Sequence, residues 1–245
     1  MYDNLKKKFG QNFLIDNNIQ TKISNLIPSY NLNIIEIGPG DGRLTQKIIE
    51  KKPKKLTLIE KDIDLIKILN DKFSKLEYVN ILNSDFLEID IKDKYHIIIS
   101  NLPYNISSQV IAKISLLKNS PNFLILMFQK EFAMRLTDKK INSINSLINC
   151  FYKIDYKFEV SRNCFRPIPK VDSRVLFFTK IKKNLIEDYE SNKFIEFKRY
   201  LFSHKRKSLG NLLKKFNYVS NIDLSLRIED LELKDLINIF RQISS

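Results

Sequence analysis

The chain has 245 residues, which is long enough for one large domain or for one domain with a small appendage. Its 42 basic and 28 acidic residues give a formal net charge of +14, which indicates a polyanionic partner, nucleic acid first and an anionic membrane surface second. No apolar stretch is long enough to span a bilayer, no secretory signal is evident, and Cys150 and Cys164 lack metal-ligand spacing. We therefore expect a cytoplasmic protein with free thiols, with no membrane association and no metal site.

Short apolar runs alternate with amphipathic stretches from about residue 33 to residue 181. The expected strands are Ile34–Ile37, Leu56–Glu60, Tyr78–Leu82, His96–Ser100, Phe123–Phe128 and, after a Pro-rich turn, Arg174–Thr179. Two segments between them, Asp62–Phe73 and Ser107–Leu117, repeat apolar residues at helical spacing. This alternation predicts an α/β fold with a parallel sheet that is covered on both faces.

The pattern becomes purely helical beyond Lys182. The expected helices there are Phe194–Phe202, Ser208–Phe216 and Asp235–Ile243. We therefore predict two domains, an α/β domain at residues 1–181 that carries a basic N-terminal segment, and a small all-helical domain at residues 182–245.

A glycine-rich turn follows the first expected strand, in the run Glu36-Ile37-Gly38-Pro39-Gly40-Asp41-Gly42. Alternating glycines such as Gly38 and Gly40 allow a tight turn and let a ligand approach the backbone. Glu60 lies 22 residues after Gly38 and closes the second strand, where a carboxylate can accept both hydroxyls of a ribose. This spacing fits both NAD and S-adenosylmethionine.

Two details favour the methyl donor over NAD. The run is G-x-G-x-G rather than G-x-G-x-x-G, and a polar turn with Asp85 follows the third strand, where it could hold an adenine amine. A purely structural turn is the alternative interpretation of the same residues.

Asn101-Leu102-Pro103-Tyr104 follows the fourth expected strand. The Asn101 amide oxygen can accept a hydrogen bond from an exocyclic amine, Pro103 stiffens the turn, and the Tyr104 ring offers a face on which a base can stack. These residues predict a site for chemistry on an amine nitrogen. The alternative is an ordinary strand-to-helix turn.

Several segments resemble the ribosomal RNA adenine dimethyltransferase family. They are the opening Phe9–Asp16 (FGQNFLID), the catalytic-type segment Asn101–Ser107 (NLPYNIS), Gln129-Lys130-Glu131, Phe165–Ser173 (FRPIPKVDS) and the basic run Phe202–Lys207 (FSHKRK). The resemblance covers nearly the whole chain. One departure is the segment Thr137–Asn145, which lacks the Tyr-Gly pair usual in the family and puts local RNA contacts in doubt.

The resemblance implies a class I methyltransferase fold, a Rossmann-like and mostly parallel seven-stranded sheet followed by a small all-helical domain. It also implies an S-adenosylmethionine pocket lined by Asn12, Leu14, Gly38, Glu60, Asp85 and Asn101, and it suggests that Phe165 covers the second face of the target base. The alternative for Phe165 is a core aromatic before a Pro-rich turn.

The match is closest to the KsgA type, which dimethylates two adjacent adenines near the 3′ end of 16S rRNA in the immature small ribosomal subunit. Two alternatives are N6-dimethylation of a 23S rRNA adenine, as in the erythromycin-resistance type, and a ribosome-assembly factor without catalysis. We expect the protein to act as a monomer.

The expected RNA-binding residues are basic and lie in two places. The C-terminal ones would face phosphates from helices, and the N-terminal ones would add a contact near the cofactor pocket. They are Lys198, Arg199, Lys205, Arg206 and Lys207, together with Lys6, Lys7 and Lys8. A solvated charged face is the alternative interpretation.

Overall fold

The computed structural model of the chain describes residues 12–216, 218 and 222–244, so Lys6, Lys7 and Lys8 lie outside the described residues. The chain forms two compact units. Unit 1 contains the chain up to Met134 and Lys153–Lys180, and unit 2 contains Arg135–Tyr152 and the chain from Ile181 onward. The segment Arg135–Tyr152 thus belongs to the helical unit, whereas the sequence analysis assigned it to the α/β domain.

Backbone hydrogen bonds within unit 2 explain why this segment belongs there. The amide of Leu185 donates to the Cys150 carbonyl at 2.9 Å, and the amide of Ile181 donates to the Phe151 carbonyl at 2.9 Å. These hydrogen bonds join the end of Arg135–Tyr152 to the start of the C-terminal helical region. The sequence analysis had placed the two segments in different domains.

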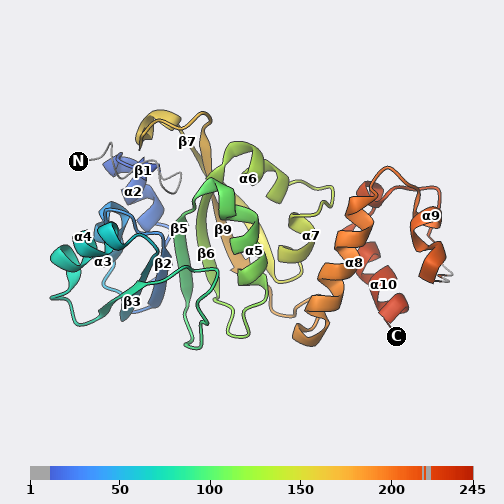
Figure 1. Cartoon of the computed structure of the whole chain (residues 1–245), viewed down its shortest axis with the longest axis horizontal. Helices are drawn as coiled ribbons and strands as arrows, with labels where there is room; N and C mark the ends of the chain where they lie inside the picture. The colour runs from blue at the N-terminus through green and yellow to red at the C-terminus, as the bar shows by residue number, and fades with distance from the viewer. Residues whose placement is uncertain (1–11, 217, 219–221, 245) are drawn as a thin grey trace. The chain divides into compact units, whose positions relative to one another are not determined.

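Unit 1 is built on a seven-stranded sheet with the order β4-β3-β2-β5-β6-β9-β7 (Figure 1). Neighbouring strands from β4 to β6 are parallel, and β9 is antiparallel to β6. The strand bounds are β2 Asn33–Ile37, β3 Lys55–Glu60, β4 Val79–Asn83, β5 Ile97–Asn101, β6 Phe123–Gln129, β7 Tyr152–Val160 and β9 Ser173–Lys180. The predicted fold class is confirmed.

The edge strand β7 was missed by the sequence analysis. Its sequence, YKIDYKFEV, mixes charged residues with aromatic ones, and most of its middle is exposed or half-buried. A solvated edge strand lacks the continuous apolar run by which the buried strands were found.

A second, two-stranded sheet fixes the start of the described chain. Strand β1 (Phe13–Leu14) pairs antiparallel with β8 (Phe165–Arg166), and the next amide, that of Ile15, donates to the Cys164 carbonyl at 2.8 Å. Two segments about 150 residues apart in the sequence are therefore held side by side.

Helices cover both faces of the large sheet (Figure 1). Helices α2 (Asn17–Ser24), α3 (Arg43–Ile49) and α4 (Ile63–Phe73) pack on one face, where Ile34, Ile97 and Ile125 belong to one apolar core. Helix α5 (Ser107–Ser115) lies on the opposite face, and α6 (Lys130–Leu136) follows β6. The strands are apolar on both sides because both sides are covered.

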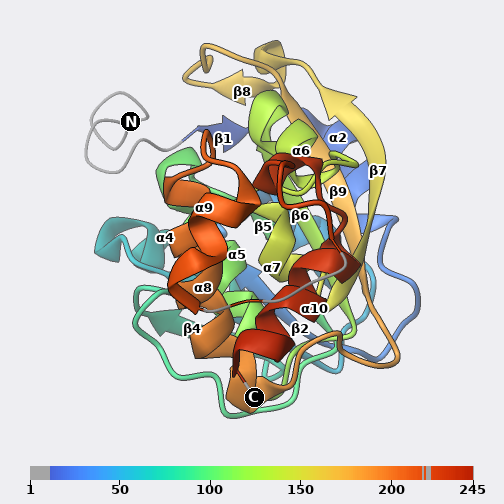
Figure 2. The same ribbon diagram turned by 90° about the vertical axis from the view of Figure 1, so that its right-hand side faces the viewer.

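Unit 2 is helical, with α7 (Asn145–Ile148), α8 (Ser191–Ser203), α9 (Leu209–Leu213) and α10 (Leu233–Ser244) (Figure 2). Aromatic contacts join α8 to α10, because the Phe240 ring lies 5.1 Å from that of Phe194 and 5.6 Å from that of Phe197.

Short 3-10 turns occur in both units, at Tyr104–Ile106, Arg162–Cys164, Asp188–Glu190, Lys214–Phe216 and Ile228–Asp230. None of the helices that the structure describes is long and apolar enough to cross a bilayer.

Gly42 begins α3 with a φ of 82°, and a Cβ added there would lie 2.6 Å from the Phe73 ring of α4. We expect Gly42→Ala to lower the free energy of unfolding by about 2–4 kcal/mol, because left-handed strain adds to the steric overlap. Gly38→Ala is the matched control, since Gly38 has a φ of 62° but nothing within 4 Å of the added Cβ. Urea denaturation should show a smaller loss for Gly38→Ala, and equal losses would contradict the role given to Phe73.

Candidate active site

Most of the predicted catalytic and cofactor-binding residues meet in one pocket of unit 1, at the carboxyl ends of β2, β3 and β5. The parallel strands bring their carboxyl ends to the same edge of the sheet, where ligands bind in open α/β folds. The predicted residues that line this pocket are Asn12, Leu14, Gly38, Gly40, Glu60, Asn101, Leu102, Pro103 and Tyr104. Asp85 lines a neighbouring pocket that shares Gly38, Glu60 and Pro103 with the first.

The Glu60 carboxylate joins the glycine turn to the end of β3. Its Oε2 accepts from the Gly40 amide at 3.2 Å, and its Oε1 accepts from the amides of Lys61 at 2.9 Å and Asp62 at 3.0 Å. Burial raises the pKa of Glu60, and the three amide donors oppose that shift. Gly38 and Gly40 both have positive φ values, of 62° and 60°, which expose the turn's backbone to the pocket.

Glu36 is a second buried carboxyl group in the pocket. It is 1% exposed, and its Oε2 accepts a hydrogen bond from the Thr45 hydroxyl at 2.6 Å. Burial raises the pKa of Glu36 from 4.5 to about 8, so the group holds a proton at neutral pH in the ligand-free protein.

The Asn101 side chain is held with its amide oxygen free to accept. Its Nδ2 donates to the Asn12 carbonyl at 3.1 Å, and this contact depends on the β1–β8 pairing that fixes the N-terminal segment. In the turn that follows, the Pro103 carbonyl accepts from the Ile106 amide and the Ser107 hydroxyl, each at 3.3 Å. The Pro103 carbonyl therefore already has two donors within the turn.

A serine from a distant strand holds Tyr104. The Tyr104 hydroxyl and the Ser173 hydroxyl are 2.9 Å apart, and Ser173 is fully buried at the start of β9, opposite Gln129 of β6. Burial raises the pKa of Tyr104, so its phenol stays neutral. Ser173 lies in the segment that resembles the family, but the sequence analysis gave it no role.

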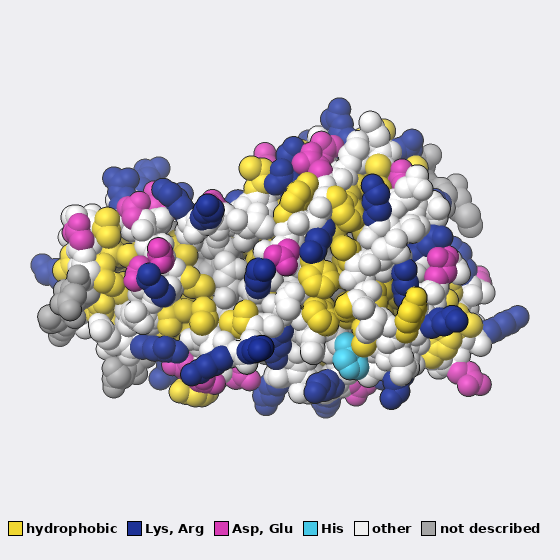
Figure 3. Space-filling view, turned by 180° about the vertical axis from the view of Figure 1, so that it is seen from behind, with side chains coloured by type: hydrophobic (Ala, Val, Ile, Leu, Met, Phe, Trp, Pro, Cys, Tyr) yellow, Lys and Arg dark blue, Asp and Glu magenta, His cyan; other side chains and the backbone are white. Residues whose placement is uncertain are grey.

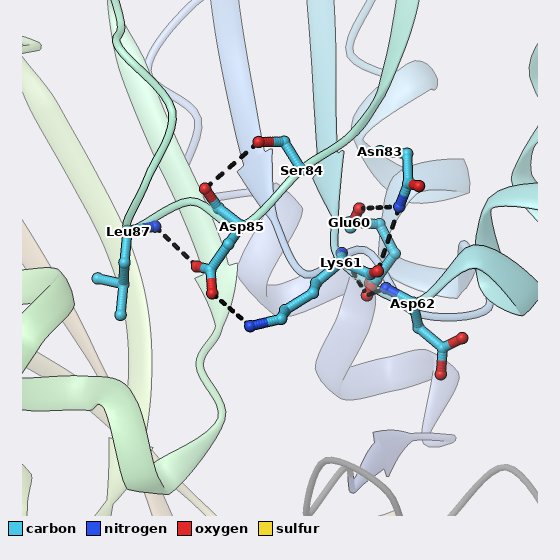
Figure 4. Close-up of polar contacts among 7 residues, drawn as sticks. All are labelled: Glu60, Lys61, Asp62, Asn83, Ser84, Asp85 and Leu87. Atoms are coloured by element: carbon cyan, nitrogen blue, oxygen red, sulfur yellow. Dashed lines mark hydrogen bonds and ion pairs between the residues drawn. The ribbon is translucent and has the colours of Figure 1, made fainter.

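The Asp85 carboxylate accepts two hydrogen bonds, both drawn in Figure 4. Its Oδ1 accepts from the Leu87 amide at 2.8 Å, and its Oδ2 accepts from the Lys61 ammonium at 2.7 Å. Burial alone would raise the pKa of Asp85, but Lys61 and the Leu87 amide outweigh it and hold this pKa below its usual value. The sequence analysis missed Lys61, although it directly follows Glu60.

The predicted stacking role of Phe165 stays a prediction. The Phe165 ring is fully buried in the apolar core of unit 1, together with Leu14 and Val160, and it lines neither of the two pockets. The alternative interpretation, a core aromatic before a Pro-rich turn, describes its position. The two residues of β8 differ in burial, since Phe165 is buried and Arg166 is exposed.

Neither histidine is among the residues that line the pocket. His96 precedes β5, and its Nδ1 accepts from the Asn33 amide at 3.0 Å at the amino end of the sheet. His204 is exposed at the end of α8 in unit 2. Within the described ranges, no group of three or more His, Cys, Asp or Glu side chains is arranged to hold a metal ion.

Four of the five predicted C-terminal RNA-binding residues, Arg199 and Lys205–Lys207, are exposed on unit 2. Lys198 differs, because its Nζ donates to the Ser143 carbonyl at 2.6 Å and burial lowers its pKa to about 8. Lys198 thus links α8 to the segment that departs from the family pattern. Figure 3 shows that basic side chains are spread over both units on the face drawn.

Comparison with solved structures shows the class to which the fold belongs. The chain superposes on a dimethyladenosine transferase from Plasmodium falciparum with a TM-score of 0.80 at 22% identity, covering 95% of this chain and 98% of that one. The 23S rRNA methyltransferase ErmE superposes with a TM-score of 0.71 at 19% identity, covering 95% and 100%. This is the fold of class I methyltransferases.

The chain belongs to the ribosomal RNA adenine dimethylase family, whose model matches residues 2–244. Relatives named ribosomal RNA small subunit methyltransferase A are 40% identical in Mycoplasmopsis pulmonis, covering 97% of this chain and 98% of the relative, and 37% identical in Pelagibacter ubique, covering 95% and 94%. The predicted family is confirmed, as are methyltransferase activity and the cofactor S-adenosylmethionine.

The raised pKa of Glu36 predicts how stability depends on pH in the ligand-free protein. The folded state holds the Glu36 proton more tightly than the unfolded state, so the free energy of unfolding should fall as the pH rises from about 4.5 to about 8. Each pKa unit corresponds to about 1.4 kcal/mol. Urea denaturation across this range should show that the free energy of unfolding depends less steeply on pH in Glu36→Gln. Part of the pH dependence should remain in this variant, because the pKa of Glu60 is also raised. An unchanged slope would mean that Glu36 is ionised in the folded state.

Proposed function

We propose that this protein dimethylates the N6 amines of two adjacent adenines near the 3′ end of 16S rRNA, within the immature small ribosomal subunit. The observation that carries the proposal is one pocket that joins a glycine turn and a buried ribose acid to Asn101–Tyr104. The names of the relatives, which refer to the small ribosomal subunit, support this target over 23S rRNA.

The residues of unit 1 fit S-adenosylmethionine. Glu60 is 5% exposed with both oxygens directed by backbone amides, and it would accept the ribose hydroxyls. Asp85 would accept the adenine amine, and Asn12, Leu14, Gly38 and Gly40 would line the rest of the site. When bound, the cofactor supplies an activated methyl group on a sulfonium.

Asn101 and the Leu102 carbonyl would orient the target amine by accepting its two N–H groups. An adenine N6 lone pair is delocalised into the ring, and these acceptors favour the pyramidal nitrogen of the transition state. Alignment then supplies much of the remaining rate enhancement. A dedicated general base is not required, because the nitrogen proton becomes acidic once nitrogen is alkylated, and neither histidine lies at the pocket.

The target base must leave its stack to reach this pocket, and Tyr104 would receive one of its faces. The hydrogen bond between Tyr104 and Ser173 holds the phenol end of the ring, so the flat face keeps one orientation. The buried Phe165 has no part in this proposal.

Basic residues of unit 2 would position the RNA through its phosphates, without reading sequence. They are Arg199, Lys205, Arg206 and Lys207, and Lys6–Lys8 would add a contact from the N-terminal segment. We further propose that the protein works in the cytoplasm as a monomer, without a metal ion, and that the helical unit is its RNA-binding domain.

Methylation of immature small subunits with labelled cofactor, followed by mapping of the modified nucleotides, tests the proposed function. We expect two adjacent dimethylated adenines near the 3′ end of 16S rRNA. Label found only in 23S rRNA, or no label with a protein that binds the subunit, would overturn it.

Asn101→Ala should lower the single-turnover rate of methyl transfer by at least about 100-fold, because one oriented acceptor is lost at the transition state. Binding of small subunits should change little, since phosphate contacts dominate RNA affinity. Asn119→Ala, on the exposed surface before β6, is the control and should retain full activity. Unchanged methylation by Asn101→Ala would refute the mechanism.

Replacing Lys205, Arg206 and Lys207 together by Ala should weaken RNA binding and flatten its salt dependence. Each lost phosphate contact should reduce the slope of log K against log salt by about 0.7–0.9. The control replaces the exposed Lys92, Lys94 and Lys118, which lie at the amino ends of β5 and β6, opposite the pocket. Filter binding over a salt series measures the RNA affinity and its salt dependence for both triple variants. Equal slopes for the two variants would show that Lys205, Arg206 and Lys207 do not contact the RNA.

A further inference from the structure

Lys61 contacts both carboxylates that flank the adenosyl half of the proposed cofactor site. Its backbone amide donates to Glu60 Oε1 at 2.9 Å, and its ammonium donates to Asp85 Oδ2 at 2.7 Å. In Figure 4 its side chain extends from the end of β3 to the loop after β4. Lys61 therefore links Glu60, the proposed acceptor of the ribose hydroxyls, to Asp85, the proposed acceptor of the adenine amine.

The ends of β3 and β4 are also joined through the backbone around Lys61. Asn83 Nδ2 donates to the carbonyls of Glu60 at 3.1 Å and Lys61 at 3.2 Å, and the Ser84 amide donates to the Glu60 carbonyl at 2.9 Å. These bonds fix the main chain but leave the Asp85 side chain to be set by Leu87 and Lys61.

The two bonds to Asp85 leave room for a ligand. A carboxylate offers about four lone-pair positions, and the Leu87 amide and the Lys61 ammonium take one position on each oxygen. Both Lys61 and Asp85 line the pocket whose apolar wall includes Ile59, Phe86 and Ile106. An exocyclic amine placed against that wall would find an ionised acceptor that is already oriented.

A second cation near Asp85 does not replace Lys61. Lys113 also lowers the pKa of Asp85 through its charge, but its Nζ donates to the Ile89 carbonyl and lies 5.3 Å from the centre of the Phe86 ring. The hydrogen bond that sets the Asp85 rotamer from across the pocket comes from Lys61.

We propose that Lys61 is a positioning residue for recognition of the adenine amine, acting through Asp85. This inference rests on the proposed role of Asp85 in the cofactor site. The Lys61 side chain is 57% exposed, so the ion pair adds little to fold stability and its removal should act on ligand selectivity instead.

The test compares the affinities of S-adenosylhomocysteine and S-inosylhomocysteine by calorimetry. The inosyl compound carries a carbonyl in place of the exocyclic amine. Lys61→Met keeps the aliphatic stem and should weaken adenosyl binding by roughly two- to fivefold, the range of an exposed ion pair, while inosyl binding changes less. The difference should shrink in 1 M salt, where the screening length is about 3 Å.

Two variants control for charge and geometry. Lys67→Met breaks an exposed ion pair with Asp64 on α4, at 3.2 Å, and makes the same charge change without touching the pocket, so it should leave both affinities unchanged. Lys61→Arg keeps a cation at this position and should therefore retain the adenosyl selectivity that Lys61→Met loses. Thermal unfolding of all variants should match that of the parent protein.

The outcomes separate this inference from the function on which it rests. If Asp85→Ala abolishes adenosyl selectivity and Lys61→Met has no further effect in that background, Lys61 acts through Asp85. If Asp85→Ala lowers selectivity while Lys61→Met leaves adenosyl binding unchanged or tighter, the Lys61 inference is overturned alone. If Asp85→Ala changes nothing, the proposed role of Asp85 fails.

Discussion

The Glu60 carboxylate provides the constraint on which the rest of the site depends. It accepts amide hydrogen bonds from the glycine turn after β2 and from the two residues that follow β3, so two separate loops are fixed to one buried group. A buried carboxylate is costly unless donors surround it, and here the donors are the loops that form the pocket. The shape of the proposed cofactor site thus depends on the hydrogen bonds of one side chain.

A second set of contacts brings distant segments to the part of the pocket formed by Asn101–Tyr104. The β1–β8 pairing holds the Asn12 carbonyl against Asn101, and the start of β9 holds Ser173 against Tyr104. Both contacts orient side chains of the same four-residue turn. Preorganised acceptors and a fixed stacking face are what methylation of a weakly nucleophilic amine requires from a protein.

Acidic and basic side chains divide between the pocket and the exposed surface. The pocket is lined by buried acidic side chains, of which Glu36 holds its proton at neutral pH and Glu60 accepts from three backbone amides, whereas the face drawn in Figure 3 carries many exposed basic side chains that suit RNA. Lys61 combines both features, since its ammonium is exposed and forms an ion pair with Asp85, an acidic residue that lines a pocket. Lys198 shows that a basic residue in a helix can instead bond to another segment of its own unit.

The sequence by itself determined the parallel strands and the pocket-lining positions of the glycine turn, Glu60 and Asn101–Tyr104, because each depends on local apolar runs or on residues adjacent in the chain. It did not determine which side chains meet across the fold. The partners Lys61 and Ser173, the inward direction of Phe165, the edge strand β7 and the place of Arg135–Tyr152 in the helical unit were all decided by tertiary structure. Register, burial and pairing between segments up to about 150 residues apart are properties of the folded chain, and local patterns carry no signal for them.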